Sequence, residues 1–322
     1  MNKKYRKGSD ALNSFFKKYI WTVLAATVLT SFTVYVALDT FIITRVYSTV
    51  ITQDSLPQNN SASEPEANEA EASLPATEAT MTENTYSDAN ITITIAEYRE
   101  YNTTLYVADV QVSSPEYLKT AFAQNTYGKN VTAKTSAIAE ANGAILAING
   151  DFYGAQTKGY VLRNGTLYRE SADSGQEDLV IWSDGSLAII TEDKVSAAEL
   201  EEKGAVQVLS FGPALVDNGS IAVSEKDEVG KAMASNPRTA IGIIDDLHYV
   251  FVVSDGRTGV SSGLSLYQLA EFMESLSVDT AYNLDGGGSS TMVFNGEIIN
   301  NPTTNGKKIS ERSVSDIVYI GY

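Results

Sequence analysis

The stretch from Ala281 to Gly296 reads AYNLDGGGSSTMVFNG, and it decides how this chain is interpreted. A short apolar run ends in one acid, Asp285, and three glycines, two serines and a threonine precede a second apolar run that closes with Asn295-Gly296. An Asn-Gly pair between apolar runs predicts a β-hairpin, so the second run is expected to be a strand that turns back at Glu297. The glycines then join two strands, and we expect their backbone amides to be open to a ligand.

A carboxylate, free N–H groups and hydroxyls at the end of one strand are typical of a site for an anionic, oxygen-rich ligand. The alternative is a tight turn whose glycines only supply positive φ angles. The acid and the hydroxyls around the glycines favour a site. The candidate binding residues in this stretch are Gly286, Gly287, Gly288, Ser289 and Ser290.

The first 43 residues predict a membrane anchor. Residues 1–18 carry six basic residues against one acid, and Tyr19–Leu38 is a run of twenty residues without a charge. A helix rises about 1.5 Å per residue, so such a run spans a hydrocarbon core of about 30 Å. It is longer than the apolar core of a signal peptide, so we expect an uncleaved, single-pass transmembrane helix over residues 19–43. The basic segment 1–18 then stays in the cytoplasm, and the rest lies outside.

The remainder of the chain predicts a linker followed by one domain. Residues 44–88 are interpreted as a disordered acidic linker, because 51–88 is rich in Glu, Ala, Ser, Thr, Asn and Pro and contains no Lys or Arg. Such a stretch has too little apolar surface to offset its chain entropy. Residues 89–322 are long enough to form one globular domain with its own core.

Charge and cysteine content narrow the partners and the compartment. The 322-residue chain has a formal net charge of −17, which excludes nucleic acid and anionic lipid surfaces as partners of its soluble part. An anionic substrate must therefore be held by a few local arginines. The chain has no cysteine, so a domain outside the membrane is held by its core alone, which favours the cell membrane and surface of a Gram-positive bacterium.

The pattern of the domain predicts the α+β class, with a large mixed β-sheet and a few helices. Short apolar strands recur between turn signals, and two segments have helical spacing, 132–142 and 266–277. In the second of these, Ser265 and Gln268 form a capping box ahead of an apolar stripe. Strands therefore predominate over helices.

Three segments share one pattern, in which an apolar strand runs into a polar cluster that contains glycine. They are Asn149-Gly150-Asp151, Ser254-Asp255-Gly256-Arg257 and the stretch at Asp285. Ligands collect where the strands of a sheet end, so these acids are expected to converge on one pocket. The candidate catalytic residues are therefore Asp285, Asp151 and Asp255. Each Asn-Gly or Asp-Gly pair in these segments, taken singly, is also compatible with an ordinary turn.

Two arginines are candidates for holding a phosphate group. Arg238 follows Pro237 at the start of a predicted strand, and Arg257 follows the second strand end. Two guanidinium forks suit the geometry of a phosphate. The alternative for Arg238 is a surface salt bridge.

Residue types exclude several chemistries. His248 is the one histidine, and it sits in a turn beside Asp245 and Asp246, so neither a zinc site nor a histidine triad is expected. A cysteine nucleophile is impossible. We expect no cofactor and assign no metal ligand, although a divalent cation held by oxygen atoms stays open.

Several motifs, in order and spacing, resemble the phosphodiester glycosidase domain family. This family includes relatives of the mannose 6-phosphate uncovering enzyme and bacterial exopolysaccharide-associated members. The motifs are NGDFYG at 149–154, NPRTAIGI at 236–243, SDGRTGVSSGLSLYQLAEFM at 254–273, NLDGGGSSTMVFNGEIIN at 283–300 and SERSVSD at 310–316. The mammalian relative has cysteines and this chain has none, so its biological role does not carry over.

The resemblance implies a hydrolase that cleaves the glycosidic C1–O bond of a sugar-1-phosphodiester in cell-surface glycans. Its partner is then an anionic glycan or sugar phosphodiester. The implied acid–base groups are Asp285 and Asp151, and Arg238, Arg257 and the Gly286–Gly288 amides would hold the departing phosphate, with Asn149 in the same substrate site. Two alternatives remain open: a non-catalytic module for binding or assembling polysaccharide, and a phosphodiesterase that cleaves the P–O bond.

Overall fold

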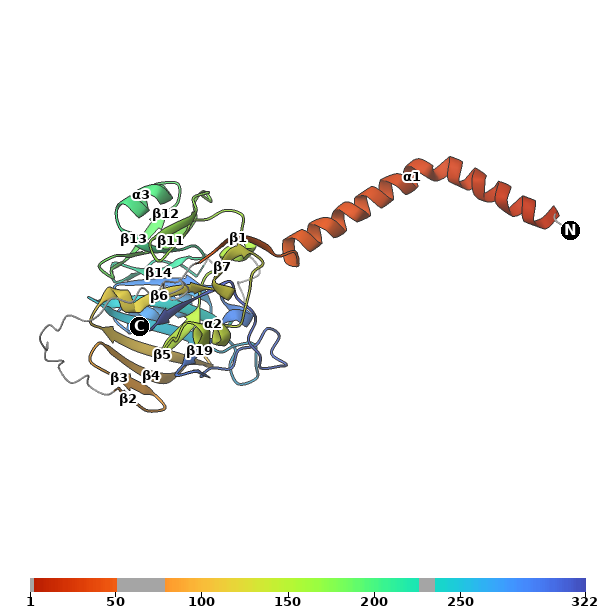
Figure 1. Ribbon diagram of the computed structural model, residues 1–322. Coiled ribbons are helices and arrows are strands. Elements are labelled where there is room, and N and C mark those ends of the chain that lie inside the picture. The colour runs from red at the N-terminus through yellow and green to blue at the C-terminus, as the bar shows by residue number, and fades with distance from the viewer. Residues whose placement is uncertain (1–2, 51–78, 226–234) are drawn as a thin grey trace, which may run out of the picture. The chain divides into compact units, whose positions relative to one another are not determined.

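The computed structural model describes residues 3–50, 79–225 and 235–322, so most of the predicted linker, 51–78, lies outside the described residues (Figure 1). The chain divides into two compact units, Met1–Arg45 and Val46–Tyr322. The first unit is one helix, α1 (Lys3–Phe41). Within it, Lys18–Phe41 contains an 18-residue window with a mean hydropathy of 1.7 and is long and apolar enough to cross a membrane. The predicted long apolar helix is therefore present and ends at Phe41, two residues before the expected boundary.

The second unit is built mainly of strands, as the sequence predicts, and each strand pair whose register is described is antiparallel. The strands are β1 (Arg45–Thr49), β2 (Thr80–Met81), β3 (Thr85–Ser87), β4 (Ile91–Glu100), β5 (Thr103–Val112), β6 (Leu118–Phe122), β7 (Thr126–Lys129), β8 (Leu146–Asn149), β9 (Val161–Arg163), β10 (Thr166–Arg169), β11 (Glu177–Trp182), β12 (Leu187–Thr191), β13 (Ala205–Leu209), β14 (Ala214–Asp217), β15 (Ser220–Ile221), β16 (Arg238–Asp245), β17 (His248–Ser254), β18 (Thr280–Leu284), β19 (Met292–Phe294), β20 (Glu297–Ile298) and β21 (Asp316–Ile320).

Within the described residues of this unit, three α-helices and several short 3-10 turns accompany these strands. They are α2 (Thr135–Ala141), α3 (Ala197–Glu202) and α4 (Leu266–Ser275), with η2 (Pro115–Tyr117), η3 (Ala123–Asn125), η4 (Tyr153–Ala155) and η6 (Gly287–Ser289). The capping box predicted at Ser265 and Gln268 is confirmed, and it starts α4. The hairpin predicted at Asn295-Gly296 is confirmed as well, because β19 pairs with β20 and both turn residues have positive φ.

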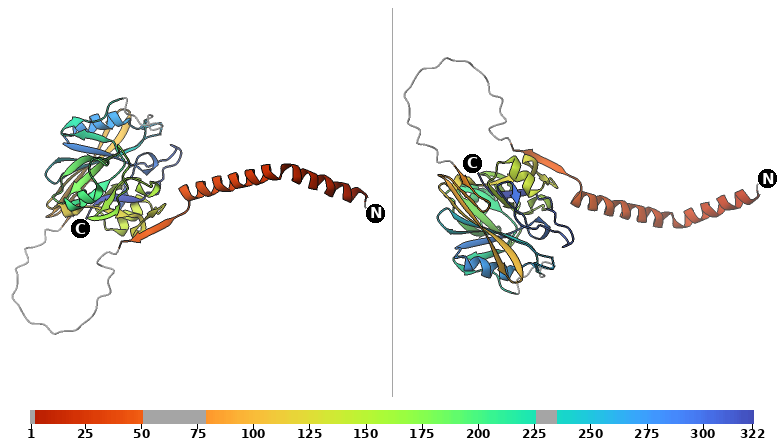
Figure 2. Two further views of the ribbon diagram at one scale, coloured as in Figure 1. Left: turned by 90° about the horizontal axis from the view of Figure 1, so that it is seen from above. Right: turned by 90° about the horizontal axis from the view of Figure 1, so that it is seen from below.

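The strands form one large sheet and smaller ones. The large sheet has nine strands in the order β15-β14-β18-β16-β17-β5-β4-β3-β2. One five-stranded sheet has the order β20-β19-β8-β21-β6, another has the order β10-β9-β13-β11-β12, and β1 pairs with β7. The α+β class with one large sheet is confirmed. In Figure 1 the α3 region lies at the top of this unit and the β2–β4 region at the bottom, and Figure 2 views the unit from above and from below.

The main core lies between the nine-stranded sheet and the two five-stranded sheets. The side chains of this core come from alternate positions along each strand. Phe251 on β17 and Ile148 on β8 are two of them. The opposite face of the nine-stranded sheet packs against α4 through Leu269 and Met273. Because both faces are covered, central strands such as β17 read as unbroken apolar runs.

Folded structure begins before residue 89, where the sequence places the domain boundary. Strands β2 and β3 extend the large sheet, and the Tyr86 side chain is buried in the main core. Upstream, the amide of Val50 donates to the carbonyl of Asn125 at 2.9 Å, and the Tyr47 ring packs against Tyr127. These segments are polar and short, which hides them in a region of linker-like composition.

Candidate active site

The three predicted strand ends meet at one place. In the large sheet, Arg238 at the start of β16 pairs with Ser254 at the end of β17, and Thr239 pairs with Leu284 at the end of β18. The end of β8 arrives from the neighbouring sheet, where the Asn149 side chain joins both sheets. Its Oδ1 accepts from the Thr239 hydroxyl at 2.8 Å, and its Nδ2 donates to the Asp285 carbonyl at 2.6 Å. The convergence predicted from the sequence is therefore present in the fold.

A cavity of about 460 Å³ opens beside these strand ends, within the usual size range of small-molecule sites. Among the described residues that line it, Asp285 is the one carboxylate, and it faces three arginines. The lining residues are Phe211, Gly212, Pro213, Asn236, Arg238, Arg257, Leu266, Asn283, Asp285, Gly286, Gly287 and Arg312. An anionic ligand is favoured here despite the negative charge of the whole chain, because the local charge is positive.

The Asp285 carboxylate is held in a fixed orientation. Its Oδ2 accepts from the Ser289 hydroxyl at 2.6 Å and from Arg312 Nη2 at 2.8 Å, while Oδ1 lies 3.1 Å from the same nitrogen. Burial raises the pKa of the Asp285 carboxyl above its usual value, and Arg312 and Ser289 oppose this shift. The result is a buried but charge-compensated acid at the cavity wall.

Arg312 is the residue that the sequence reasoning missed as a functional group. Its Nε donates to the Ser289 hydroxyl oxygen at 2.9 Å, so one guanidinium holds both the serine and the acid. The side chain remains 41% exposed and can also contact a ligand. The sequence feature that could have pointed to Arg312 is its place in the SERSVSD motif. Residues 301–315 have no helical or strand periodicity, so the sequence did not show that Arg312 reaches the cavity.

The two predicted phosphate-binding arginines both line the cavity. Arg238 is 5% exposed, and its Nε donates to the Leu264 carbonyl at 3.0 Å. Arg257 has a positive φ of 61°, and its fork is held by Asn236 Oδ1 at 2.8 Å and the Thr304 carbonyl at 2.6 Å. Burial, together with the nearby charge of Arg312, lowers the pKa of Arg257. Such crowding of cations is relieved when an anion binds.

The glycine triplet allows close packing at the strand end, and one of its three amides is bonded within the protein, while binding of phosphate by the other amides stays a prediction. The Gly287 N–H donates to the Pro237 carbonyl at 2.8 Å. A Cβ on Gly287 would lie 2.9 Å from Arg257 Nη2, and one on Gly288 would lie 2.4 Å from the Thr304 hydroxyl. The glycines therefore allow Arg257 and the loop at Thr304 to pack closely against the strand end.

The side chains of Ser289, Ser290 and Asn149, which were predicted to bind substrate, do not belong to the cavity lining. Ser289 is fully buried and reaches Asp285 and Arg312, while the Ser290 hydroxyl is buried and lies apart from the cavity lining. Asn149 is fully buried, and it positions the Asp285 main chain. A direct contact of Asn149, Ser289, Ser290 or Gly288 with substrate stays a prediction, and the geometry gives Asn149 and Ser289 positioning contacts.

Asp151 lies outside the cavity lining, in a sealed cluster. Its Oδ2 contacts Arg163 Nη2 at 2.7 Å and accepts from the Ser210 amide at 2.9 Å. Arg163 also pairs with Asp316 at 2.8 Å, and all three side chains are at most 2% exposed. Burial, with the charge of Asp151 beside it, raises the pKa of Asp316 well above its usual value, against the effect of Arg163.

Asp255 also turns away from the cavity lining. Its two oxygens accept from the main-chain amide and the side-chain amide of Asn301, at 2.8 Å and 2.9 Å. The strand ends thus converge, but among the three candidate acids Asp285 is the one that reaches the cavity. Catalytic roles for Asp151 and Asp255 stay predictions, and their observed contacts are structural.

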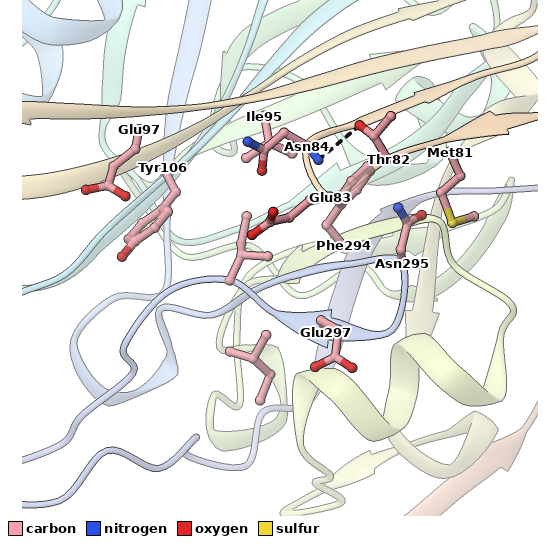
Figure 3. A pocket seen from close by; sticks show the side chains of 12 residues that line it. Met81, Thr82, Glu83, Asn84, Ile95, Glu97, Tyr106, Phe294, Asn295 and Glu297 are labelled. Atoms are coloured by element: carbon pink, nitrogen blue, oxygen red, sulfur yellow. Dashed lines mark hydrogen bonds between the residues drawn. The ribbon is translucent and has the colours of Figure 1, made fainter.

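A larger cavity of about 830 Å³ lies elsewhere, between the β2–β3 and β19–β20 hairpins (Figure 3). Figure 3 shows the carboxylates of Glu83, Glu97 and Glu297 around it, and they are the charged groups among its described lining residues. Such a lining repels an anionic ligand. The smaller, arginine-lined cavity is therefore the better candidate for the active site.

Metal ligation finds no support in the described part of the chain, which contains no group of three or more His, Asp or Glu side chains placed to hold an ion. The single histidine, His248, lies near Asp109 and Asp245 at the other end of β17 from the cavity. The cavity chemistry that the residues offer is therefore that of one carboxylate and three guanidinium groups.

Comparison with known proteins places these features in a family. Residues 142–321 match the family model described as phosphodiester glycosidase. The chain is 30% identical over 184 residues to the SPbeta prophage-derived uncharacterized protein YomE of Bacillus subtilis, covering 56% of this chain and 28% of the relative. It is 31% identical over 179 residues to mouse N-acetylglucosamine-1-phosphodiester alpha-N-acetylglucosaminidase, covering 50% and 34%. The chain thus spans about a third of the length of these relatives.

A solved structure has a similar fold. It is the catalytic domain of zebrafish N-acetylglucosamine-1-phosphodiester alpha-N-acetylglucosaminidase, auto-inhibited by its pro-peptide, and it aligns with a TM-score of 0.58 at 23% identity. The alignment covers 72% of this chain and 83% of that one. At this identity the likeness concerns the fold.

Proposed function

The chain belongs to the phosphodiester glycosidase family, and from this premise we propose that its second unit hydrolyses the C1–O bond of a sugar-1-phosphodiester. The observation that carries the proposal is the cavity in which one oriented carboxylate, Asp285, faces Arg238, Arg257 and Arg312. This set matches a reaction that develops positive charge on a sugar and releases an anionic phosphate. The curated mammalian relatives are named for such a reaction.

In the proposed reaction the bond between C1 and the bridging oxygen breaks, and that oxygen leaves with the phosphate. Arg238 and Arg257 hold the departing phosphomonoester, which is a good leaving group and needs little acid assistance. Water attacks C1, and its proton passes to the Asp285 carboxylate and then to solvent. The negative charge of Asp285 also stabilises the oxocarbenium-like transition state.

Arg312 and Ser289 act through Asp285 in this proposal. By holding the same carboxylate they favour its ionised form against the effect of burial and fix the direction of its free lone pairs. Asp151 pairs with Arg163 and Asp255 bonds Asn301, both outside the cavity lining, so this proposal gives neither acid a step in the reaction.

The test is hydrolysis of a panel of α- and β-linked sugar-1-phosphodiesters by the full chain in detergent, run in ¹⁸O-labelled water. Cleavage of the C1–O bond leaves the released phosphomonoester without label. Label in the phosphomonoester would instead identify the P–O phosphodiesterase. Binding of the panel without turnover would identify the non-catalytic polysaccharide module.

The location of the reaction is part of the same proposal. The apolar segment Lys18–Phe41, behind a basic N-terminal stretch, supports a single-pass anchor with the second unit outside the cell, facing surface glycans. External protease should remove a C-terminal tag from intact protoplasts. A tag that stays fully protected would contradict this topology.

A further inference from the structure

One residue of the cavity wall, Asn283, carries an acceptor that the described residues leave without a hydrogen bond. Asn283 lies on β18, two residues before Asp285, so the two side chains share one face of the strand, with their Cα atoms about 7 Å apart. Both line the cavity, and Asn283 is 2% exposed. The strand β18 and the residue that follows it therefore supply a buried amide and the carboxylate to the same space.

The orientation of the Asn283 amide is fixed by its neighbours. Nδ2 donates to the Gly212 carbonyl at 2.7 Å, so the other end of the amide must be Oδ1. Within the described part of the chain, Oδ1 is buried without a hydrogen-bond partner. A buried acceptor left unpaired is unfavourable, and a donor on a ligand would restore its hydrogen bond.

The order of the strands separates the two sides of the cavity. β18 lies between β14 and β16, so the Phe211–Pro213 segment that leads into β14 flanks it on one side and Arg238 on the other. Phe211, Pro213 and Leu266 give the cavity its apolar lining surface. A phosphate is expected beside the arginines because its charge is opposite to theirs. The sugar then lies on the Phe211–Pro213 side of the cavity.

We propose that Asn283 is a specificity-determining residue, whose Oδ1 accepts a hydrogen bond from one hydroxyl or amide N–H of the sugar unit. The inference rests on the proposed function of the same cavity. An amide oxygen repels a phosphate oxygen and requires a donor. Asn283 thus orients the sugar on the Phe211–Pro213 side, with C1 toward Asp285 and the phosphate toward the arginines.

The test combines Asn283→Ala with a series of monodeoxy analogues of a hydrolysed substrate. In the wild type, one deoxy position should lower kcat/KM by about 10- to 100-fold, because the acceptor is then left unpaired. In Asn283→Ala the same position should be discriminated less than about twofold, while discrimination at the other positions is kept. Discrimination that persists at every position, or falls equally at all, would overturn the proposal.

Asn236→Ala is the matched control. Asn236 lines the same cavity, but its Oδ1 already accepts from Arg257 at 2.8 Å. Its loss should lower kcat/KM for the whole series by a common factor and keep the sensitivity to the single deoxy position. If Asn283→Ala does not fold, Asn283→Ser, which leaves the backbone bonds to Gly212 and Pro213, serves in its place.

Calorimetric binding of the same analogues separates failure of this inference from failure of the proposed function. If the wild type binds a member of the sugar-1-phosphodiester panel but hydrolyses none, the glycosidase proposal is wrong, and the deoxy series is then made from the bound member. The Asn283 inference then stands or falls on whether the substitution removes the affinity difference at one deoxy position. Absence of any binding by the wild type would overturn both.

Discussion

Two acids that follow strand ends in similar sequence settings have opposite surroundings in the fold. Asp285, after β18, lies at a cavity wall with Arg312, whose side chain is 41% exposed. Asp151, after β8, pairs with Arg163, and both side chains are sealed from solvent together with Asp316. The comparison teaches that a strand-end acid lies at a cavity or is sealed in the interior according to which arginine reaches it from elsewhere in the chain. Each prediction below tests that division between an open and a sealed acid.

The largest effect is expected from breaking the sealed cluster. Arg163→Ala leaves Asp151 and Asp316 buried without their cation, and it should lower the free energy of unfolding by about 3–5 kcal/mol. Denaturant unfolding measures this loss. Lys203→Ala, which removes an exposed pair with Glu199, is the control and should cost at most about 0.5 kcal/mol. Equal losses in the two variants would remove the case for a structural cluster.

The open cavity should respond in activity. Arg257→Ala and Arg238→Ala should each cost roughly 2–4 kcal/mol of transition-state stabilisation, seen as a fall in kcat/KM for a phosphodiester substrate. Lysine should restore activity only in part, because it lacks the planar fork. The control residue for these two variants is Arg169, which donates hydrogen bonds to three carbonyl oxygens outside the cavity.

Arg169→Ala should show the reverse pattern from the cavity arginines. It should lower the melting temperature and leave kcat/KM of the folded protein nearly unchanged. Near-wild-type activity in both cavity variants would mean that Arg238 and Arg257 only hold the loops that they contact.

Asp178, another buried acid, lies on β11 and should give the stability of the protein a pH dependence. Burial, reinforced by the neighbouring Glu192, raises the pKa of the Asp178 carboxyl to about 10. Between the ordinary value in the unfolded chain and this raised value, the native state keeps a proton that the unfolded state releases, so stability falls as pH rises. Asp178→Asn should flatten that fall between pH 5 and pH 9. Parallel stability curves for wild type and variant would contradict it.

Much of the fold was predictable because local rules determine it. The hairpin at Asn295-Gly296 follows from turn chemistry, and the start of α4 follows from its capping box. The convergence of strand ends follows from apolar runs that stop at polar clusters. These features need only residues that are near one another in the sequence.

The partners of the acids were not predictable in the same way. Arg163 lies 12 residues from Asp151, and Arg312 lies 27 residues from Asp285, in segments whose own pattern says nothing about either acid. The sequence therefore gives Asp151 and Asp285 the same local signal, and the long-range packing separates them. The strand β1, which pairs with β7, was missed for the same reason.

The most direct test of this division is to measure kcat and melting temperature together for Asp285→Asn and Asp151→Asn in the full chain. The account predicts that Asp285→Asn lowers kcat on the order of a hundredfold or more and changes the melting temperature little. It predicts that Asp151→Asn lowers the melting temperature and keeps most of the kcat in the protein that folds. The opposite assignment, with nearly normal kcat in Asp285→Asn, would contradict the claim that Asp285 is the reactive carboxylate.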